Sequence, residues 1–284
     1  MAGYHARMGP RIVVLGSVQD GGFPHAGCAC IACSAARERP ELRRRVASIG
    51  LVGATGRTLL VDATPDLTAQ LALLAHEAGR ERLAPDLVAL THAHIGHYLG
   101  LAYLGREAMD TRRIPVHGTA KMLAFLRHNR PWSHLVERGE IDLQPLQPGE
   151  PIAFDGVEIH AFLSPHRGED SDTLGFEIRG PARTLVYVSD ADVLPPGLVD
   201  RIDESDVALV DGTFWSKDEL PGRDQLAVRH PLVKESIGVL AKGRGEVWFT
   251  HLNHTNPLLH PDPARRPPLP ARFGVASEGQ VFPL

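Results

Sequence analysis

Three histidines, His92, His94 and His97, lie within six residues of one another, directly after the apolar run Asp86–Leu90. Such a run predicts a buried strand, so the histidines would lie where that strand ends and the chain turns. Neutral imidazoles that converge on one point can hold a divalent metal, which makes hydroxide available near neutral pH. A single histidine is usually a structural residue, but this H-x-H-x-x-H spacing predicts a metal site.

Three further candidate ligands follow later strand-like runs. They are His166, Asp190 and His251, and each one taken alone would be interpreted as a polar loop residue or a helix cap. Their shared position is the argument, because ligands held at strand ends along one sheet edge can converge without backbone strain. We therefore predict that these side chains meet the histidines at positions 92–97.

The cysteines form a second cluster, Cys28, Cys30 and Cys33, which contains all the cysteine in the chain. They are too close together, and odd in number, to form a disulfide framework. Metal binding fits this spacing better. The alternative is a set of three reduced, buried thiols.

Composition limits the class of protein. The chain has 284 residues, 43% of them hydrophobic, which is enough for a substantial core. Its net charge of −4 argues against a basic nucleic-acid-binding surface, so we expect a small-molecule substrate rather than nucleic acid. No apolar stretch approaches the roughly 18 residues of a membrane span, and the start of the chain has only the short run Ile12–Leu15. We expect a cytoplasmic protein without membrane contact, and the sequence is compatible with either a monomer or a homodimer.

Strand-like runs recur along the chain and alternate with helical segments. Strands are predicted at 11–16, 47–52, 58–62, 86–91, 152–163, 173–179, 184–189, 207–211 and 246–250. Helices are predicted at 65–78, 96–107, 119–128, 195–202 and 231–241, the first with Thr64 as N-cap and Pro65 at its first position. Each half contains a hairpin, which predicts one α+β domain with two sheets face to face and helices outside, a four-layer αββα sandwich.

The ordered polar residues resemble the metallo-β-lactamase-fold superfamily, in which H-x-H-x-D-H is followed by a distant histidine, an aspartate and a final histidine. The resemblance runs nearly from end to end and implies one such domain over residues 1–284. It implies that Asp62 is buried and supports the metal loop without binding metal. It also implies one or two active-site divalent metals, zinc, manganese or iron, with these ligands: His92, His94, His97, His166, Asp190 and His251.

Residues 14–33, 62–71 and 251–259 resemble the coenzyme PQQ synthesis protein B group. The C-x-C-x-x-C element with a later histidine also resembles the cyclic-phosphate diesterase of phosphonate breakdown, where the matching residues hold a structural zinc. The resemblance implies a zinc-knuckle insertion near 28–33 with one structural zinc on Cys28, Cys30, Cys33 and His254. A closed tetrahedral Cys₃His site is chemically suited to zinc.

The segment 229–236 resembles a helix start in the tRNA-maturing ribonuclease Z branch. The histidine there donates a proton to the leaving group, which makes His230 the candidate general acid. His230 is equally interpretable as a plain helix-start residue before Pro231, and both interpretations stay open. The resemblance also makes Asp190 a candidate catalytic residue, as a ligand able to bridge two metals.

Gly96 stands where the superfamily pattern has the carboxylate ligand of the second metal. Loss of a charged oxygen ligand is expected to weaken the second site, so the metal pair would be uneven or singly occupied. A site with two histidines and one carboxylate could instead be refitted for iron and O₂ chemistry. We expect Gly96→Asp to increase the occupancy of the second metal if the site is hydrolytic.

Three functions are compatible with these residues. The first is a metal-dependent hydrolase that attacks a phosphodiester or related small molecule through a metal-bound hydroxide, with His230 protonating the leaving group. The second is an iron-dependent oxygenase or oxidase related to PQQ synthesis protein B, which the resemblance and Gly96 suggest. The third is a protein that binds a metal or small ligand without turnover. Retention of His92 and His94 favours the hydrolase.

Overall fold

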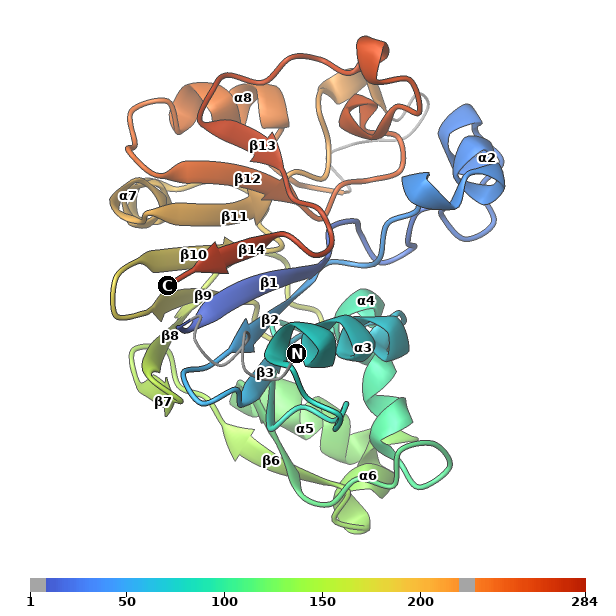
Figure 1. The fold of residues 1–284 in the computed structure, drawn as a ribbon, viewed down its shortest axis with the longest axis vertical. Helices are drawn as coiled ribbons and strands as arrows, with labels where there is room; N and C mark the ends of the chain where they lie inside the picture. Colours follow the sequence, from blue (N-terminus) through green and yellow to red (C-terminus); the bar gives the residue numbers. More distant parts are fainter. Residues whose placement is uncertain (1–8, 220–227) are drawn as a thin grey trace.

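The computed structural model describes residues 9–219 and 228–284. Two seven-stranded sheets pack face to face, and helices cover their outer faces (Figure 1). The predicted αββα sandwich is therefore confirmed.

The first sheet is mixed, and both ends of the described chain contribute to it. Its order is β14 (Val281–Pro283), β1 (Arg11–Gly16), β2 (Ser48–Val52), β3 (Thr58–Val61), β4 (Leu87–Ala89), β5 (Ile114–Gly118) and β6 (Ile141–Pro145). Strand β2 is antiparallel to both β1 and β3, so β1 and β3 point the same way, and β3 to β6 run parallel to one another. The carboxyl ends of β1, β3 and β4 therefore lie on the same edge.

The second sheet is built in the same way. Its order is β13 (Phe273–Val275), β12 (Glu246–Thr250), β11 (Val207–Asp211), β10 (Thr184–Val188), β9 (Leu174–Arg179), β8 (Val157–Leu163) and β7 (Pro151–Phe154). Strands β10, β11 and β12 are parallel, and β8 shares their direction because β9 is antiparallel to both β8 and β10. The carboxyl ends of β8, β10, β11 and β12 therefore lie on one edge as well.

Three apolar clusters hold the layers together. The cluster between the sheets includes Phe176, Ile178 and Tyr187, which are fully buried. A second cluster joins the first sheet to α3 (Leu67–Ala78), α5 (Ala120–His128) and α6 (Trp132–Glu137). A third joins the second sheet to α2 (Ile31–Glu38), α7 (Pro196–Glu204) and α8 (Val233–Val239). Burial of this much apolar surface is the main favourable term in folding and fixes the sheet edges relative to each other.

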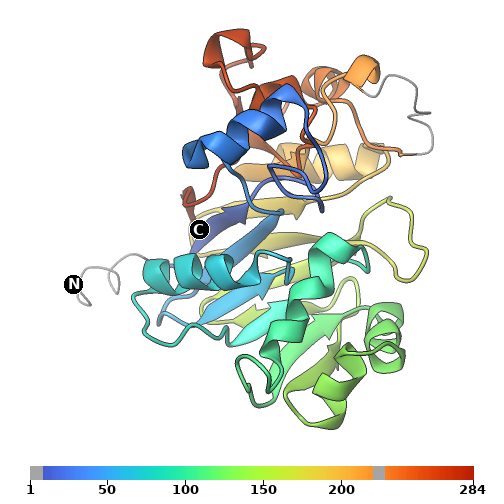
Figure 2. The same ribbon diagram turned by 90° about the vertical axis from the view of Figure 1, so that its right-hand side faces the viewer.

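The remaining elements are short helical segments in the connections between strands. Helix α4 (Ile95–Tyr98) follows β4 and continues into a 3₁₀ segment, Leu99–Leu104. Further 3₁₀ turns lie at Pro40–Leu42, Lys217–Glu219, Pro257–Leu259 and Pro263–Arg265. Figures 1 and 2 show α2 (blue) beside the red segment that follows β12, although the two are far apart in sequence.

Several details differ from the sequence-based prediction. Helix α3 begins at Leu67 with Asp66 as N-cap, because the Thr64 hydroxyl accepts the Asp66 N–H at 3.0 Å in a turn before the helix. Helices α2 and α6 were not predicted, and the predicted helix 96–107 is the short α4 followed by a 3₁₀ segment.

Strands β5, β6, β13 and β14 were not predicted either. Strands β13 and β14 have three residues each, whereas β5 and β6 interleave apolar residues with polar residues and proline, and Pro115 interrupts the donor pattern of β5. Among the helices that the structure describes, none combines the length and apolar character needed to cross a membrane.

Candidate metal centre

Four of the predicted ligands form a first subsite at the sheet edges. His92 and His94 follow β4, His166 follows β8 and Asp190 follows β10, and each offers one donor atom within 4.8 Å of the others. His94 Nδ1 lies 3.4 Å from His166 Nε2, while its Nε2 lies 3.2 Å from the exposed carboxylate of Glu169. The first subsite therefore presents three imidazoles and one carboxylate.

A second subsite lies on the other side of Asp190. His97 Nε2 is 3.4 Å from Asp190 Oδ2, and His251 Nε2 is 3.4 Å from Asp190 Oδ1. The same carboxylate is 3.8 Å from His166 Nε2 in the first subsite. Asp190 thus lies between the two subsites and contacts histidines of both.

The donor atoms of this centre fit a cation. His92 Nε2, His97 Nε2, His251 Nε2 and Asp190 Oδ2 are buried and make no hydrogen bond among the described residues. Leaving a buried polar group unpaired costs about 1–3 kcal/mol, so four such atoms facing one region need a common partner. A divalent metal would satisfy them together.

The pKa shifts of His92 and Asp190 suit this donor set, whereas that of His97 favours a bound proton. Burial would lower the pKa of His97, but the carboxylates of Asp62 and Asp190 raise it well above its ordinary value, so a metal there must displace that proton. Burial lowers the pKa of His92 well below its ordinary value, which keeps the imidazole neutral with a free lone pair. Burial would raise the pKa of Asp190, but the histidines around it, with His251 and His97 foremost, hold it well below its ordinary value. Neutral imidazoles and an ionised carboxylate are the forms that bind metal.

Carboxylate acceptors orient two of the imidazoles, those of His97 and His166, toward the centre. Asp62 is fully buried and pairs with His97 Nδ1 at 2.7 Å, and it also accepts the Thr91 N–H at 2.8 Å. Asp192 accepts from His166 Nδ1 at 2.8 Å. Such contacts fix the ring orientation and leave Nε2 for the metal. Asp62 thus lies where the resemblance implied.

Two of the orienting residues were missed by the sequence analysis. They are Asp192 and Thr213, whose hydroxyl lies 3.0 Å from His251 Nδ1. Their sequence signal is only that each follows a strand end by a few residues. That position is common to many loop residues, so it did not distinguish them.

Two residues of the centre adopt a left-handed backbone conformation, as do Asp110, Arg113 and Asp155 elsewhere. Asp62 has φ of 66° and His251 has φ of 58°, both in the left-handed region. This conformation costs a non-glycine residue roughly 1–2 kcal/mol and is often found at functional sites. Here it directs both side chains out of the strand ends into the centre.

The space beside Gly96 is filled by a residue that the sequence analysis missed, Asp20. A Cβ atom on Gly96 would lie 2.3 Å from Asp20 Oδ1 and 2.8 Å from Asp20 Cα. Asp20 Oδ1 is also 3.5 Å from His97 Nε2 and 3.6 Å from His251 Nε2. The signal was present, because Asp20 follows the first strand just as the other site residues follow theirs. Gly96→Asp would therefore bring two carboxylates into one space, and the expected gain in metal occupancy no longer holds.

His230 lies beside the centre and contacts the polar side chains of Asp211 and Thr213. Its ring centroid is 5.5 Å from that of His166 and 5.9 Å from that of His251. Its Nδ1 pairs with Asp211 Oδ2 at 2.6 Å, and Thr213 Oγ1 lies 3.2 Å away. Burial would lower the pKa of His230, but the Asp211 carboxylate outweighs it and raises that pKa above its ordinary value. The Asp211 carboxylate therefore favours the protonated form of His230.

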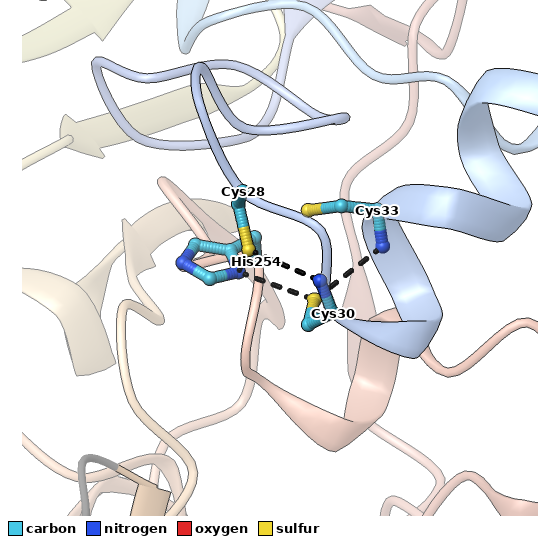
Figure 3. Close-up of side chains that lie close together, drawn as sticks. All are labelled: Cys28, Cys30, Cys33 and His254. Atoms are coloured by element: carbon cyan, nitrogen blue, oxygen red, sulfur yellow. Dashed lines mark hydrogen bonds between the residues drawn. The ribbon is translucent and has the colours of Figure 1, made fainter.

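The cysteine cluster is assembled from two distant segments (Figure 3). His254 Nδ1 lies 3.6 Å from Cys28 Sγ and 3.7 Å from Cys30 Sγ. One donor atom from each of Cys28, Cys30, Cys33 and His254 lies within 4.8 Å of the others. The predicted knuckle residues are thus brought together, and Cys30 also forms the N-cap of α2.

The sulfur atoms are oriented by backbone donors. The Cys30 N–H donates to Cys28 Sγ at 3.4 Å, the Cys33 N–H to Cys30 Sγ at 3.5 Å and the His25 N–H to Cys33 Sγ at 3.3 Å. The first of these bonds lowers the pKa of Cys28, whereas burial raises the pKa of Cys33 to about 12. Zinc would deprotonate all three thiols, and the donors would stabilise the resulting thiolates.

Comparison with known proteins supports this architecture. A family model described as the β-lactamase superfamily domain matches residues 57–252. Coenzyme PQQ synthesis protein B from Rhodopseudomonas palustris is 30% identical over 90% of this chain and 93% of its own length. The protein of the same name from Methylobacterium radiotolerans is 30% identical over 96% of this chain and 100% of its own length.

Solved structures show the same similarity. Zinc-bound PqqB from Methylobacterium extorquens superposes with a TM-score of 0.84 at 25% identity, over 96% of this chain and 100% of that chain. A diphosphatase of the PhnP family superposes with a TM-score of 0.72 at 23% identity, over 96% of both chains, which shows a common fold.

Gly96→Ala tests the close approach of Asp20. The added methyl group must displace the backbone at Asp20, so we expect a loss of about 1–3 kcal/mol in the free energy of unfolding. Gly238→Ala in α8 is the matched control, since a Cβ there meets nothing within 4 Å, and it should be neutral or stabilising by about 0.5–1 kcal/mol. Urea unfolding of both metal-free variants measures the difference. Equal stability of the two would show that the space beside Gly96 is open.

His254→Ala tests the knuckle. We expect the protein to lose one tightly bound zinc ion per chain and its thiols to react faster with a disulfide reagent, because the closed coordination shell is broken. His25→Ala is the control: the His25 ring stacks beside His254 at 4.5 Å, but its imidazole is not part of the donor cluster. Equal zinc loss in both variants would contradict the assignment of His254.

Proposed function

This chain belongs to the β-lactamase superfamily, and from that premise we propose that it is a metal-dependent hydrolase of small phosphodiesters or related esters. The observation that carries the proposal is the arrangement around Asp190. One buried carboxylate lies between two groups of imidazoles, and a histidine held by Asp211 stands beside them.

Divalent metal binding follows from the donor set. The unpartnered Nε2 atoms and Asp190 Oδ2 form a preorganised shell, and PqqB from Methylobacterium extorquens is a zinc-bound protein of the same fold. His92, His94 and His166 would hold one ion, with Asp190 shared. A metal held there supplies Lewis acidity and makes a hydroxide nucleophile available near neutral pH.

The residues of this chain would perform the remaining steps. As hydroxide attacks phosphorus, the bond from phosphorus to the leaving oxygen breaks, and that oxygen gains negative charge. His230 then donates its Nε2 proton to the leaving oxygen, while its Nδ1 stays paired with Asp211. Asp211 holds the imidazole in orientation and stabilises its charged form before transfer. His230 is therefore the general acid of the proposal.

The substrate class follows from charge and from the centre itself. The net charge of −4 disfavours a long polyanion, so a small phosphodiester suits this chain better than a structured RNA. The likeness to a diphosphatase of the PhnP family is compatible with phosphoryl chemistry.

An iron-dependent oxygenase is the second candidate. The observation that favours it is the 30% identity to coenzyme PQQ synthesis protein B over nearly the whole chain. Two histidines and a carboxylate with open positions suit iron and O₂. His230 and Asp211 have no required part in that chemistry, which is why hydrolysis is preferred.

Metal analysis combined with a turnover assay tests the proposal. Protein purified without oxygen should contain zinc or manganese and should hydrolyse bis(p-nitrophenyl) phosphate, and Asp190→Ala should abolish turnover because it removes the shared ligand. Iron with O₂ consumption and no ester hydrolysis would support the oxygenase instead. Bound metal without either activity would indicate a non-catalytic binder.

The dependence on leaving group tests His230. A poor leaving group such as the sugar alkoxide of a cyclic nucleotide needs protonation, so His230→Gln should lower kcat by about 10²–10⁴-fold for that substrate. For p-nitrophenolate, which leaves readily as an anion, the loss should be roughly tenfold or less. The exposed His128→Gln is the control and should change neither. Equal losses on both substrates would exclude His230 as the general acid.

A further inference from the structure

The second subsite, as the superfamily pattern places it, lacks its carboxylate. Position 96 is glycine, so His97, His251 and the shared Asp190 are the ligands that remain from the predicted set. A subsite with so few charged donors would bind its ion more weakly than the first subsite. Yet His97 Nε2 and His251 Nε2 are both buried without a hydrogen bond, like His92 Nε2 of the first subsite.

We propose that Asp20 supplies the missing carboxylate, so that the second metal ligand comes from the loop after β1 instead of from α4. Asp20 Oδ1 lies 3.5 Å from His97 Nε2 and 3.6 Å from His251 Nε2. One donor atom from each of these three residues lies within 4.8 Å of the others. The inference rests on the proposed function only in requiring a metal at this centre and is independent of the reaction catalysed.

Glycine at position 96 is what allows Asp20 to take the place of a ligand from α4. Its virtual Cβ would lie 2.3 Å from Asp20 Oδ1 and 2.8 Å from Asp20 Cα, closer than real Cβ contacts allow. The backbone at Asp20 therefore lies directly over position 96, and its carboxylate enters the region that a side chain from position 96 would otherwise enter. Only a residue without a Cβ atom lets Asp20 pack this closely against position 96.

The loop that carries Asp20 is tied to the loop that carries His251. The Gln19 N–H donates to the Leu252 carbonyl at 3.1 Å, and Gln19 Nε2 donates to Asn253 Oδ1 at 2.6 Å. Asn253 is buried, so this amide pair is sheltered from water. Two ligands of the second subsite are thereby held in fixed relation, as a preorganised metal site requires.

With Asp20 included, each subsite has its own donors in addition to the shared Asp190. The first subsite has three imidazoles, the second has two imidazoles and Asp20, and Asp190 is shared. The side chain of Asp20 is 32% exposed, whereas that of Asp190 is 2% exposed. Asp20 is therefore the most exposed of the residues that would hold the second ion.

Asp20→Asn tests the assignment, because it keeps the shape of the side chain and removes its charge. Zinc titration by calorimetry and elemental analysis after gel filtration should show one fewer tightly bound ion per chain and at least about a tenfold weaker last site. The knuckle ion should be retained, which makes it an internal reference. Asp172→Asn is the matched control: it removes an exposed carboxylate from the loop after His166 and should keep the full zinc content.

A purely structural role for Asp20 predicts a different pattern. In that case Asp20→Asn would lower the Tm of the metal-free protein and leave zinc stoichiometry and affinity unchanged, and this result would overturn the proposal. We expect instead similar metal-free Tm values and a smaller zinc-induced rise in Tm for Asp20→Asn. If Asp20→Asn does not fold, Asp20→Ala provides the same comparison.

The outcomes separate this inference from the proposed function. Loss of one ion in Asp20→Asn would support the ligand assignment even if the wild-type protein hydrolyses no phosphodiester. Full zinc binding by Asp20→Asn would overturn the assignment even if the wild-type protein is an active hydrolase.

Discussion

The organising constraint in this protein is a buried carboxylate without a hydrogen-bond partner on one of its oxygens. Asp190 is 2% exposed and is enclosed by imidazole nitrogens that are themselves unpaired. Taking an ionised carboxylate out of water is expensive unless an opposite charge or a metal compensates it. Asp62, Asp192 and Thr213 also favour a bound cation. Each contacts Nδ1 of one histidine, which leaves the Nε2 atom of that ring for the cation.

The two-sheet architecture explains how residues so far apart in sequence reach that carboxylate. Strands β1, β3, β4, β8, β10, β11 and β12 all end at the edge where the centre lies, and each is followed within a few residues by a polar side chain. The apolar layers fix the edges, so short loops are sufficient to place the ligands. A fold of this kind can exchange one ligand-bearing loop for another without changing the core, which is consistent with the varied activities of the related proteins.

Much of this could be predicted from the sequence, and the limits have physical causes. Strongly apolar strands such as β1, β11 and β12 were located to the residue, because their patterns are clear. Strands β5 and β6 are as long as β11, but their apolar residues alternate with polar residues and proline, and they form because neighbouring strands supply their partners. Residues with a dense local spacing, such as Cys28 and Cys30, were identified readily. Asp20 was not, since a single aspartate before two glycines also describes an ordinary turn.

The close packing of Asp20 against Gly96 has an evolutionary consequence. A carboxylate at position 96 and a carboxylate at position 20 cannot occupy the same space, because the first carbon of any side chain on Gly96 would already overlap Asp20. A lineage that moves the ligand from one position to the other must therefore pass through an ancestor that lacks it or one in which both crowd the pocket. The residues at positions 20 and 96 are therefore coupled, so that a change at either one is tolerated only together with a change at the other.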